Sequence, residues 1–342
     1  MLEKLIIVSN ESVFEDGNNF YCDNIDLKSI PEGLSKYFEV INIARKSKIQ
    51  RTHKVNIKEN QTSSNIFNFL FKIFKTAKNK DMKKYLIISI TPYTFFAYLL
   101  LSILKKKIFV YLRSDGYEEY KYIIGFFGRL FYHIMFWTVS KKSNLISCRS
   151  HILKGKSGKV VSPSQLSQKW FQSQKKADLN KIKLLYVGRI KVEKGIFSLL
   201  KIIQSLNLDF HLTIVGSGKN NNDHGIKQKN VTVINFENVD DSIIEIYDNH
   251  NIFILPSFTE GHPQVLDESL SRLRPVIVFD EISHVVRDRK GVFVSNRNSD
   301  SLTDKINFIV KNYNEIKKKI LTNTFPTKEK FIKEISSIII DN

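Results

Sequence analysis

The sequence predicts an α/β protein with two doubly wound domains, each built on a parallel sheet. Along its 342 residues, short apolar runs rich in β-forming residues alternate with segments of helix length. Such an alternation is typical of parallel sheets with crossover helices. It stops at a polar segment, 164–181, and starts again after it. A chain of this length also favours two domains over one.

The two domains are expected at 1–163 and 182–325, with a linker over 164–181. Residues 326–342 are expected to form a C-terminal helix that can pack back towards the N-terminal domain. Apolar runs predict the strands of both domains, at 5–9, 38–43, 85–90, 108–112, 144–147 and 160–163, and at 184–188, 211–216, 231–235, 252–256 and 275–279. Ligands of such folds bind beyond the carboxyl ends of the strands, so two domains that face each other would form a cleft for a ligand.

One apolar stretch, 85–104, is 20 residues long and uncharged, which is long enough to span a bilayer. Thr91 and Pro92 divide it, however, so we expect a buried strand followed by a buried helix. A second apolar stretch, 122–139, is interrupted by Arg129 and His133. The sequence therefore predicts a protein that touches a membrane without crossing it.

The charge of the chain is strongly positive and uneven. There are 53 Lys and Arg against 34 Asp and Glu, a net charge of +19. Residues 1–163 hold 27 basic and 13 acidic side chains, a net of +14, so this half favours an anionic partner: nucleic acid, an acidic membrane or an anionic substrate. Only Cys22 and Cys148 are present, which excludes a disulfide scaffold and a cysteine-built zinc site.

The first candidate site follows the strand expected at 252–256. Glu260 lies just beyond the end of this strand, and Pro263 is suited to the first turn of a helix that reaches about Leu273. Gly261 has no side chain, so an anion can approach the backbone N–H groups at the helix start. Glu268 lies more than a turn into the helix. Both carboxylates can flank one ligand rich in hydroxyl groups, although each can equally be a solvated surface glutamate.

The second candidate site follows the strand expected at 184–188. Arg189 and Lys194 lie between this strand and a helix that begins near Gly195. Arg189 can contact a diphosphate with its fork of N–H groups and Lys194 as a point charge. A solvated basic turn is the alternative.

With these residues, the sequence resembles the retaining glycosyltransferases of the GT-B fold, glycosyltransferase family four. The motifs that match are 186–189 with Lys194 and Gly195, 211–218, 256–257, and Glu260 separated from Glu268 by seven residues. The resemblance implies two Rossmann-like domains and a nucleoside diphosphate sugar as donor. Arg189 and Lys194 would hold the diphosphate, Glu268 the ribose and Glu260 the transferred sugar. The donor cradle would be completed by Gly261, His262, Pro263, Gln264 and Val265.

The N-terminal half departs from that family. Gly17 stands in the region where the family often has a glycine pair, so it is a candidate for contact with the donor. Arg113 and Asp115 stand where many members have a histidine, and they are candidate catalytic residues that face the sugar. The alternative for both is a capped turn before a helix over 117–139.

Neither a metal nor another cofactor is expected. The sequence contains no Asp-x-Asp triplet, the pair of carboxylates that holds a divalent ion against a diphosphate in metal-dependent sugar transferases. The helix-start amides, Arg189 and Lys194 can neutralise the leaving diphosphate instead.

The sequence therefore predicts transfer of a sugar, with retention of configuration, to a hydroxyl acceptor. One alternative is a catalytically inactive subunit that binds nucleotide sugars, because the histidine is missing. Another is a basic nucleic-acid-binding protein. That alternative explains the net charge but neither candidate site, so no nucleic acid partner is expected.

A basic, apolar segment at 66–80 points to a membrane. Phe67, Leu70, Phe71 and Phe74 fall on one helical face, and this face is flanked by Lys72, Lys75, Lys78 and Lys80. An amphipathic helix packed on its own sheet is the alternative. In the resembling family the N-terminal half takes the acceptor, often a lipid-linked or surface-polysaccharide intermediate. We therefore expect a cytoplasmic protein, peripheral on the inner face of the cytoplasmic membrane, that extends a bacterial glycan such as capsule or O-antigen.

Overall fold

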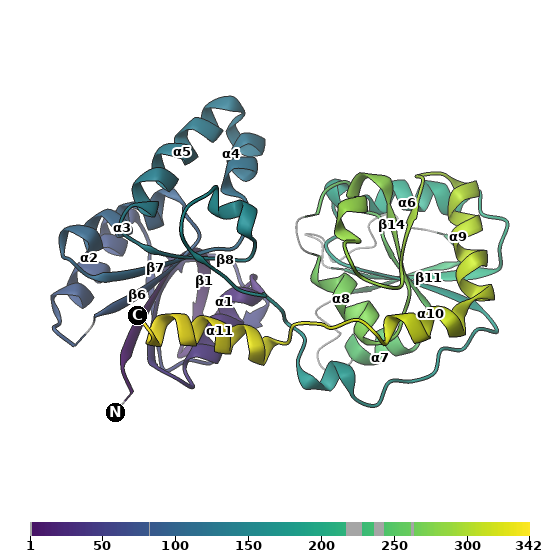
Figure 1. The fold of residues 1–342 in the computed structure, drawn as a ribbon, viewed down its shortest axis with the longest axis horizontal. Coiled ribbons are helices and arrows are strands. Elements are labelled where there is room, and N and C mark those ends of the chain that lie inside the picture. The colour runs from purple at the N-terminus through teal and green to yellow at the C-terminus, as the bar shows by residue number, and fades with distance from the viewer. Residues whose placement is uncertain (1, 82, 217–227, 236–242, 261–262) are drawn as a thin grey trace. The chain divides into compact units, whose positions relative to one another are not determined.

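The chain folds into two compact units (Figure 1). The computed structural model describes residues 2–81, 83–216, 228–235, 243–260 and 263–342. Unit 1 contains Met1–Gln165 together with Pro326–Asn342, and unit 2 contains Leu166–Phe325. Most of the segment predicted as a linker, 164–181, thus lies in unit 2, where Leu166 and Trp170 are buried in the core.

Unit 1 is built on a sheet of parallel strands in the order β5-β3-β1-β6-β7-β8-β9. These strands are β1 (Lys4–Asp16), β3 (Glu39–Lys46), β5 (Glu59–Ser63), β6 (Lys84–Ile88), β7 (Lys107–Leu112), β8 (Asn144–Ser147) and β9 (Lys159–Val160). The second half of β1 continues as a hairpin with β2 (Asn19–Cys22), which also pairs with β4 (His53–Lys54). The first strand was predicted to end at Ser9, but the hairpin extends it to Asp16.

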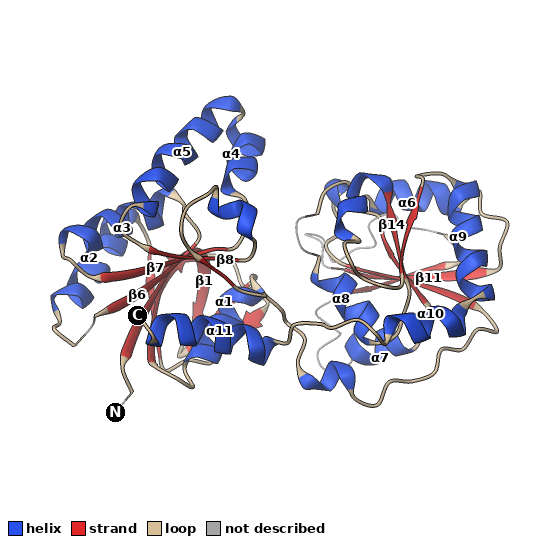
Figure 2. Cartoon of the chain, in the orientation of Figure 1, coloured by secondary structure: helices blue, strands red, loops and turns tan. Residues whose placement is uncertain are grey.

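Helices cover both faces of this sheet (Figure 2). One core contains side chains of α2 (Ile66–Lys78), α3 (Pro92–Ile103) and α5 (Phe126–Ser140). The opposite core contains α1 (Ile25–Leu34) and the C-terminal α11 (Lys328–Ile340). Glu334 of α11 accepts the Ser162 backbone N–H at 2.7 Å, and Lys84 donates to the Ile339 carbonyl at 2.8 Å. The last helix is therefore an integral layer of unit 1.

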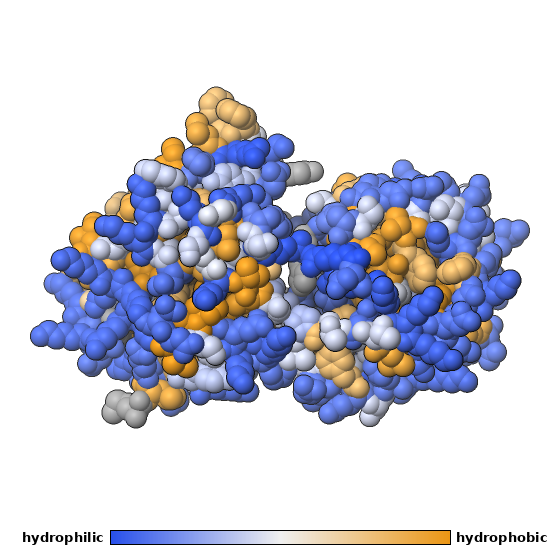
Figure 3. All heavy atoms as spheres, viewed as in Figure 1, coloured by the Kyte–Doolittle hydropathy of each residue, from blue (hydrophilic) through white to orange (hydrophobic). Residues whose placement is uncertain are grey.

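Two apolar stretches of unit 1 raised the question of a membrane span. Residues 85–104 form β6 and then α3, as the sequence predicts, and the Thr91 side chain caps this helix. The single helix expected over 117–139 is wrong: it is broken at Gly125, which has φ +75°, into α4 (Gly116–Ile124) and α5. Among the described residues, no helix has the length and apolar character needed to cross a membrane. Figure 3 shows apolar side chains at the far end of the α4–α5 hairpin.

Unit 2 is a six-stranded parallel sheet in the order β12-β11-β10-β13-β14-β15. The strands are β10 (Ile182–Val187), β11 (Phe210–Gly216), β12 (Val231–Asn235), β13 (Ile252–Leu255), β14 (Val276–Phe279) and β15 (Val292–Ser295). The order in space is 3-2-1-4-5-6 in chain numbering, which is that of the Rossmann fold. The sheet is flanked by the helices α6 (Ile196–Ile203), α7 (Ile243–Asp248), α8 (Gln264–Ser271), α9 (Ser299–Lys311) and α10 (Tyr313–Ile320), and by the short helices η2 (Gln168–Phe171), η3 (Val192–Lys194) and η5 (Asp280–Val285).

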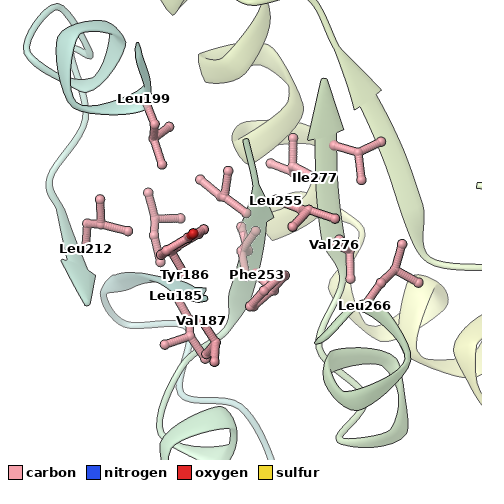
Figure 4. Close-up of a cluster of buried hydrophobic side chains, with 14 of the residues drawn as sticks. Leu185, Tyr186, Val187, Leu199, Leu212, Phe253, Leu255, Leu266, Val276 and Ile277 are labelled. Carbon is pink, nitrogen blue, oxygen red and sulfur yellow. The ribbon is translucent and has the colours of Figure 1, made fainter. Parts of the chain in front are cut away.

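The central strands of unit 2 are apolar because both faces of the sheet are covered. Figure 4 shows Leu185, Phe253 and Ile277 from three neighbouring strands with Leu199 of α6 and Leu266 of α8. All five side chains are buried. This core fixes β10 beside β13, and these are the two strands at which the strand order reverses.

Candidate functional site

The two sequence-predicted motifs of unit 2 lie at adjacent strand ends. Parallel pairing of β10 with β13 brings Gly188 and Glu260 to the same edge of the sheet. The loops contact each other there: the Phe258 N–H donates to the Glu193 carbonyl at 3.1 Å. Gly195 has φ +67°, and a Cβ at this position would lie 1.8 Å from the Pro256 carbonyl oxygen. Only glycine allows this approach, so the loops form one rigid rim at the switch point of the sheet.

Lys194 and Glu260 form an ion pair in this rim. The Lys194 Nζ lies 2.6 Å from Glu260 Oε1, which also accepts from the Ser257 hydroxyl at 2.7 Å. The side chains are 21% and 11% exposed, so the pair is largely withdrawn from water. The sequence predicts separate roles for these two residues and does not predict their contact. An anion that binds Lys194 therefore competes with the Glu260 carboxylate for it.

Arg297 fixes the loop that carries Glu260. Its Nη2 donates to the Pro256 carbonyl at 2.9 Å, and its Nε donates to Glu281 at 2.7 Å. The guanidinium also lies 4.2 Å from the ring centroid of Phe258. His284 adds a bond from Nε2–H to the Glu260 carbonyl at 2.7 Å. Sequence reasoning missed both residues, because they follow later strands and share no local motif with Glu260.

Arg189 is exposed at the carboxyl end of β10. Its carbonyl accepts from the Tyr186 hydroxyl at 2.8 Å, which orients the turn. Within the described ranges, its guanidinium has no ion-pair or hydrogen-bond partner. A cation with its charge uncompensated at a switch point is suited to an anionic ligand.

Glu268 lies on α8 and is partly buried. Its Oε2 accepts from the hydroxyl of Tyr247 at 2.9 Å. Burial raises the pKa of Glu268 to about 7, although the bond from Tyr247 acts in the opposite direction. The neighbouring Asp267 holds α8 in place through two bonds from Arg289, at 2.6 and 3.0 Å. The carboxyl group is therefore held by a fixed donor and titrates near neutral pH.

The raised pKa of Glu268 predicts a pH-dependent stability. Between pH 4.5 and about 7 the folded state keeps a proton on Glu268 that the unfolded chain has released, so this contribution to stability is lost as the pH rises. The shift corresponds to at most about 3 kcal/mol. We expect the difference in unfolding free energy between wild type and Glu268→Gln to fall by up to this amount from pH 5 to pH 8. An equal difference at both pH values would contradict the raised pKa.

The start of α8 carries the remaining predicted residues of the donor cradle. Gly261 and His262 lie outside the described residues. Pro263 is the N-cap, one position before the first turn in which it was expected, and it provides no side-chain cap. Gln264 and Val265 begin the helix, which ends at Ser271 rather than near Leu273. The first turn thus has the amide-rich end that binds anions, and its role in binding stays a prediction.

Behind Glu268 lies a buried charge network that the sequence did not predict. Arg272 donates to both carboxylate oxygens of Asp248, at 2.9 and 2.6 Å, and also to the carbonyls of Trp170 and Gln172. Arg274 donates to the Tyr247 and Asp248 carbonyls at 3.2 and 2.7 Å. The network therefore holds the backbone at Tyr247, whose hydroxyl holds Glu268. Charged residues at the end of a helix usually lie on the surface, so nothing in the sequence indicated that Arg272 and Arg274 are buried.

The candidate residues of unit 1 lie in separate settings. Gly17, with φ +56°, is in the exposed β1–β2 turn, which needs this conformation. Arg113 lies 3.8 Å from Asp26. Asp115 caps α4 through the Tyr117 N–H and pairs with Lys154 at 2.7 Å. Asp115 thus makes the contact expected if it only caps the helix that follows. Contact of Gly17, Arg113 and Asp115 with a sugar remains a prediction.

Carboxylate and histidine groups are dispersed in the part of the chain that the structure describes. No three His, Cys, Asp or Glu residues there lie close enough to share a metal ion.

The chain is similar to known glycosyltransferases. The family model "Glycosyl transferases group 1" matches residues 168–324. The capsular polysaccharide biosynthesis glycosyltransferase CapM of Staphylococcus aureus is 32% identical over 136 residues, which are 36% of this chain and 36% of that protein. The matched segment thus spans little more than a third of this curated relative.

Two solved structures cover nearly the whole chain. WaaG, a glycosyltransferase involved in lipopolysaccharide biosynthesis, has a TM-score of 0.66 at 12% identity and covers 98% of this chain and 100% of its own. Anabaena HepE, solved with UDP and with UDP-glucose, has a TM-score of 0.67 at 12% identity for the UDP complex, which covers 98% of this chain and 95% of its own. At such identities the likeness shows the fold. It confirms the predicted pair of Rossmann-like domains, which is the fold of GT-B glycosyltransferases. Residues 168–324 therefore match the Glycosyl transferases group 1 family model, in a chain with the fold of GT-B glycosyltransferases.

Proposed function

We propose that the protein is a retaining glycosyltransferase of family four that uses a nucleoside diphosphate sugar. The observation that carries the proposal is the Lys194–Glu260 pair at the switch point of unit 2, with Glu268 on the helix that follows. A cation for the diphosphate and a carboxylate for hydroxyl groups thus meet where the loops after β10 and β13 touch, and a second carboxylate lies on the helix that follows Glu260. UDP, which HepE binds in its solved complexes, is the first nucleotide to test.

In the proposed reaction, the bond between the anomeric carbon and the β-phosphate oxygen breaks. A bond from that carbon to the acceptor oxygen forms on the same face, and the acceptor proton passes to the departing diphosphate. Lys194, Arg189 and the amides of α8 stabilise the developing negative charge without a metal. Glu260 and Glu268 accept from hydroxyls of the sugar and the ribose, respectively. Lys194 can turn from Glu260 towards the diphosphate when the donor binds.

The acceptor that we propose is a lipid-linked or surface-polysaccharide intermediate. The support comes from the relatives, since CapM is named for capsular polysaccharide and WaaG for lipopolysaccharide. We place the protein in the cytoplasm, peripheral on the inner face of a bacterial membrane. The basic surface of unit 1 and the exposed Phe67 and Phe71 of α2 support this location.

A catalytically inactive subunit that binds nucleotide sugars is the second candidate. It is favoured by the partners of the residues that stand in place of the family histidine: Arg113 lies beside Asp26, and Asp115 pairs with Lys154. Turnover of UDP-glucose and related donors with lipid-linked acceptors distinguishes the two candidates. An inactive subunit would bind the donor without turnover.

Donor binding should depend on Arg189 and Lys194. A charge-assisted hydrogen bond contributes about 1.5–3 kcal/mol, so replacing either residue with Ala should weaken UDP binding about tenfold or more. Isothermal titration calorimetry measures this. Lys191→Ala is the matched control, because Lys191 is an exposed lysine of the same loop that pairs with Glu193. Wild-type affinity in Lys194→Ala would remove the assignment of the diphosphate to this rim.

Activity should persist in EDTA. The leaving diphosphate is neutralised by protein cations and helix-start amides in this mechanism, so chelation should leave turnover within about twofold of its starting value. The measurement is initial rate with and without EDTA. Complete loss, restored by magnesium or manganese, would contradict the metal-independent mechanism.

A further inference from the structure

The α4–α5 hairpin of unit 1 (Figure 1) carries exposed apolar side chains, which Figure 3 shows at its far end. We call Ile123, Phe126, Phe127, Leu130, Ile134 and Trp137 the apolar ridge. Phe126 and Phe127 at its tip are 77% and 75% exposed. Neighbouring exposed apolar residues of this number are unusual for a surface that faces only water.

The hairpin that presents the ridge is tightly built. Gly125, with φ +75°, makes the turn between the helices. A Cβ at Gly128 would lie 2.1 Å from the Tyr120 carbonyl oxygen, so α4 and α5 approach each other closely. Below the turn, the ring of Tyr117 packs edge-on against that of Tyr132. The Tyr117 hydroxyl is hydrogen-bonded to Nδ1 of His133, at 2.9 Å. The ridge is therefore held outward by a defined scaffold.

Helix α5 is apolar on both of its faces. Tyr132, Met135 and Phe136 are buried against the sheet. On the other side, Phe127, Leu130 and Ile134 recur at the same helical spacing and are exposed. A helix with apolar residues on two opposite faces is normally covered on both of them. The outer face therefore requires an occupant.

The chemistry of the surroundings favours an anionic lipid bilayer as this occupant. Lys121, Arg129, Lys141 and Lys142 are exposed along the hairpin and at its base. Residues 1–163 carry a net charge of +14, which is attracted to anionic headgroups. The ammonium of Lys141 lies 3.0 Å from the ring centroid of Trp137, and Trp and Lys together are typical of a membrane interface. A second copy of the chain would bring another +19, and this repulsion disfavours self-association through the ridge.

The dimensions of α5 indicate insertion without spanning. It has 15 residues, which corresponds to a length of about 22 Å, shorter than the ~30 Å hydrocarbon core of a bilayer. It also carries Arg129 and His133. A segment of this kind lies in the interface with its apolar side chains in the acyl boundary.

We propose that the apolar ridge inserts into the interface of an anionic bilayer, with Phe126 and Phe127 deepest and Trp137 at headgroup level. This deepens the peripheral membrane association of the proposed function and rests on it. Helix α2 lies on the same face of the sheet as α5. Its lysines attract the protein to anionic headgroups, and the apolar ridge inserts into the bilayer interface.

The two tryptophans of the chain give a direct test. Trp137 is 48% exposed on the ridge, whereas Trp170 is 8% exposed in unit 2. In a Trp170→Phe background, vesicles of phosphatidylglycerol and phosphatidylcholine should shift the Trp137 emission to the blue. Acyl chains brominated near the headgroup should quench it. Phosphatidylcholine alone should do neither.

Variants separate insertion from attraction in the same vesicle assay. Phe126→Ser/Phe127→Ser should lower the partition coefficient about tenfold or more. The control, Ile49→Ser/Leu321→Ser, removes two apolar side chains that are 71% and 59% exposed at other places on the surface, and it should bind like wild type. Lys75→Glu/Lys78→Glu/Lys80→Glu should lower binding mainly at low salt. Lys72 is left in place, because it donates to the Thr62 carbonyl.

Circular dichroism of every variant checks that unit 1 is folded, and titration with UDP, whose proposed site is in unit 2, keeps the two proposals apart. Failure of the wild type to bind any nucleoside diphosphate, with UDP tested first, would overturn the donor assignment and leave the vesicle results interpretable. If the wild type pellets with vesicles while the Trp137 emission is neither shifted nor quenched, insertion of the apolar ridge is refuted and the donor assignment stays intact. A blue shift that follows protein concentration without lipid would show a second copy on the ridge and would also overturn the proposal.

Discussion

Replacing Asp248 with Asn should lower the unfolding free energy of unit 2 by about 3–5 kcal/mol. The carboxylate is buried and holds Arg272, which is itself buried. Breaking a buried pair leaves a guanidinium charge without compensation, a loss of this size. Arg274 would also lose its charged neighbour, 3.8 Å away. The whole network behind Tyr247 should therefore loosen.

Urea denaturation of the full chain measures this loss. A Trp137→Phe background leaves Trp170 as the fluorescence reporter, and Trp170 lies within the network, since its carbonyl accepts from Arg272. Asp209→Asn makes the same chemical change at an exposed position of unit 2 and should be within about 0.5 kcal/mol of wild type. If Asp248→Asn also falls within this margin, Arg272 is not held as the structure indicates.

The two glutamates of the site should separate in their effects. Glu260→Ala should lower kcat about 10²-fold, because its proposed partner is the sugar at the reacting carbon. It should not weaken UDP binding, since its removal frees Lys194 from a 2.6 Å ion pair. Glu268→Ala should weaken UDP binding about tenfold, because the ribose remains in that ligand.

Calorimetry with UDP and initial rates with the full donor measure both variants. Glu315→Ala, an exposed glutamate on α10, is the control and should match wild type in both assays. Equal losses of UDP affinity in Glu260→Ala and Glu268→Ala would refute the division between sugar and ribose.

The central strands were predictable because both faces of the sheet are buried. The apolar runs 252–256 and 275–279 correspond to the buried strands β13 (Ile252–Leu255) and β14 (Val276–Phe279). By contrast, β5 reads Glu-Asn-Gln-Thr-Ser and was missed, since its place beside β3 comes from pairing and not from apolar character. Gly125 was read as part of one helix because apolar residues continue on both sides of it.

The candidate site was predictable where it follows a strand. Arg189 and Glu260 come directly after apolar runs, so the sequence places them at a sheet edge. Their neighbours were not predictable in the same way. Lys194 and Glu260 are 66 residues apart in the chain, and only the pairing of β10 with β13 brings them together. Arg297 and His284 reach the loop from elements after β14, which no local pattern indicates.

The position of α11 has a consequence for synthesis of the chain. Unit 2 is one continuous segment, Leu166–Phe325, whereas unit 1 needs Pro326–Asn342. On the ribosome, unit 2 can therefore acquire its complete core while one face of the unit 1 sheet still lacks Phe331, Ile335 and Ile339. A nascent chain that ends at Phe325 exposes this apolar face, including the surroundings of Gly33, which packs against Ile332. Chaperones that recognise exposed apolar surface should bind that intermediate and release it once α11 has emerged.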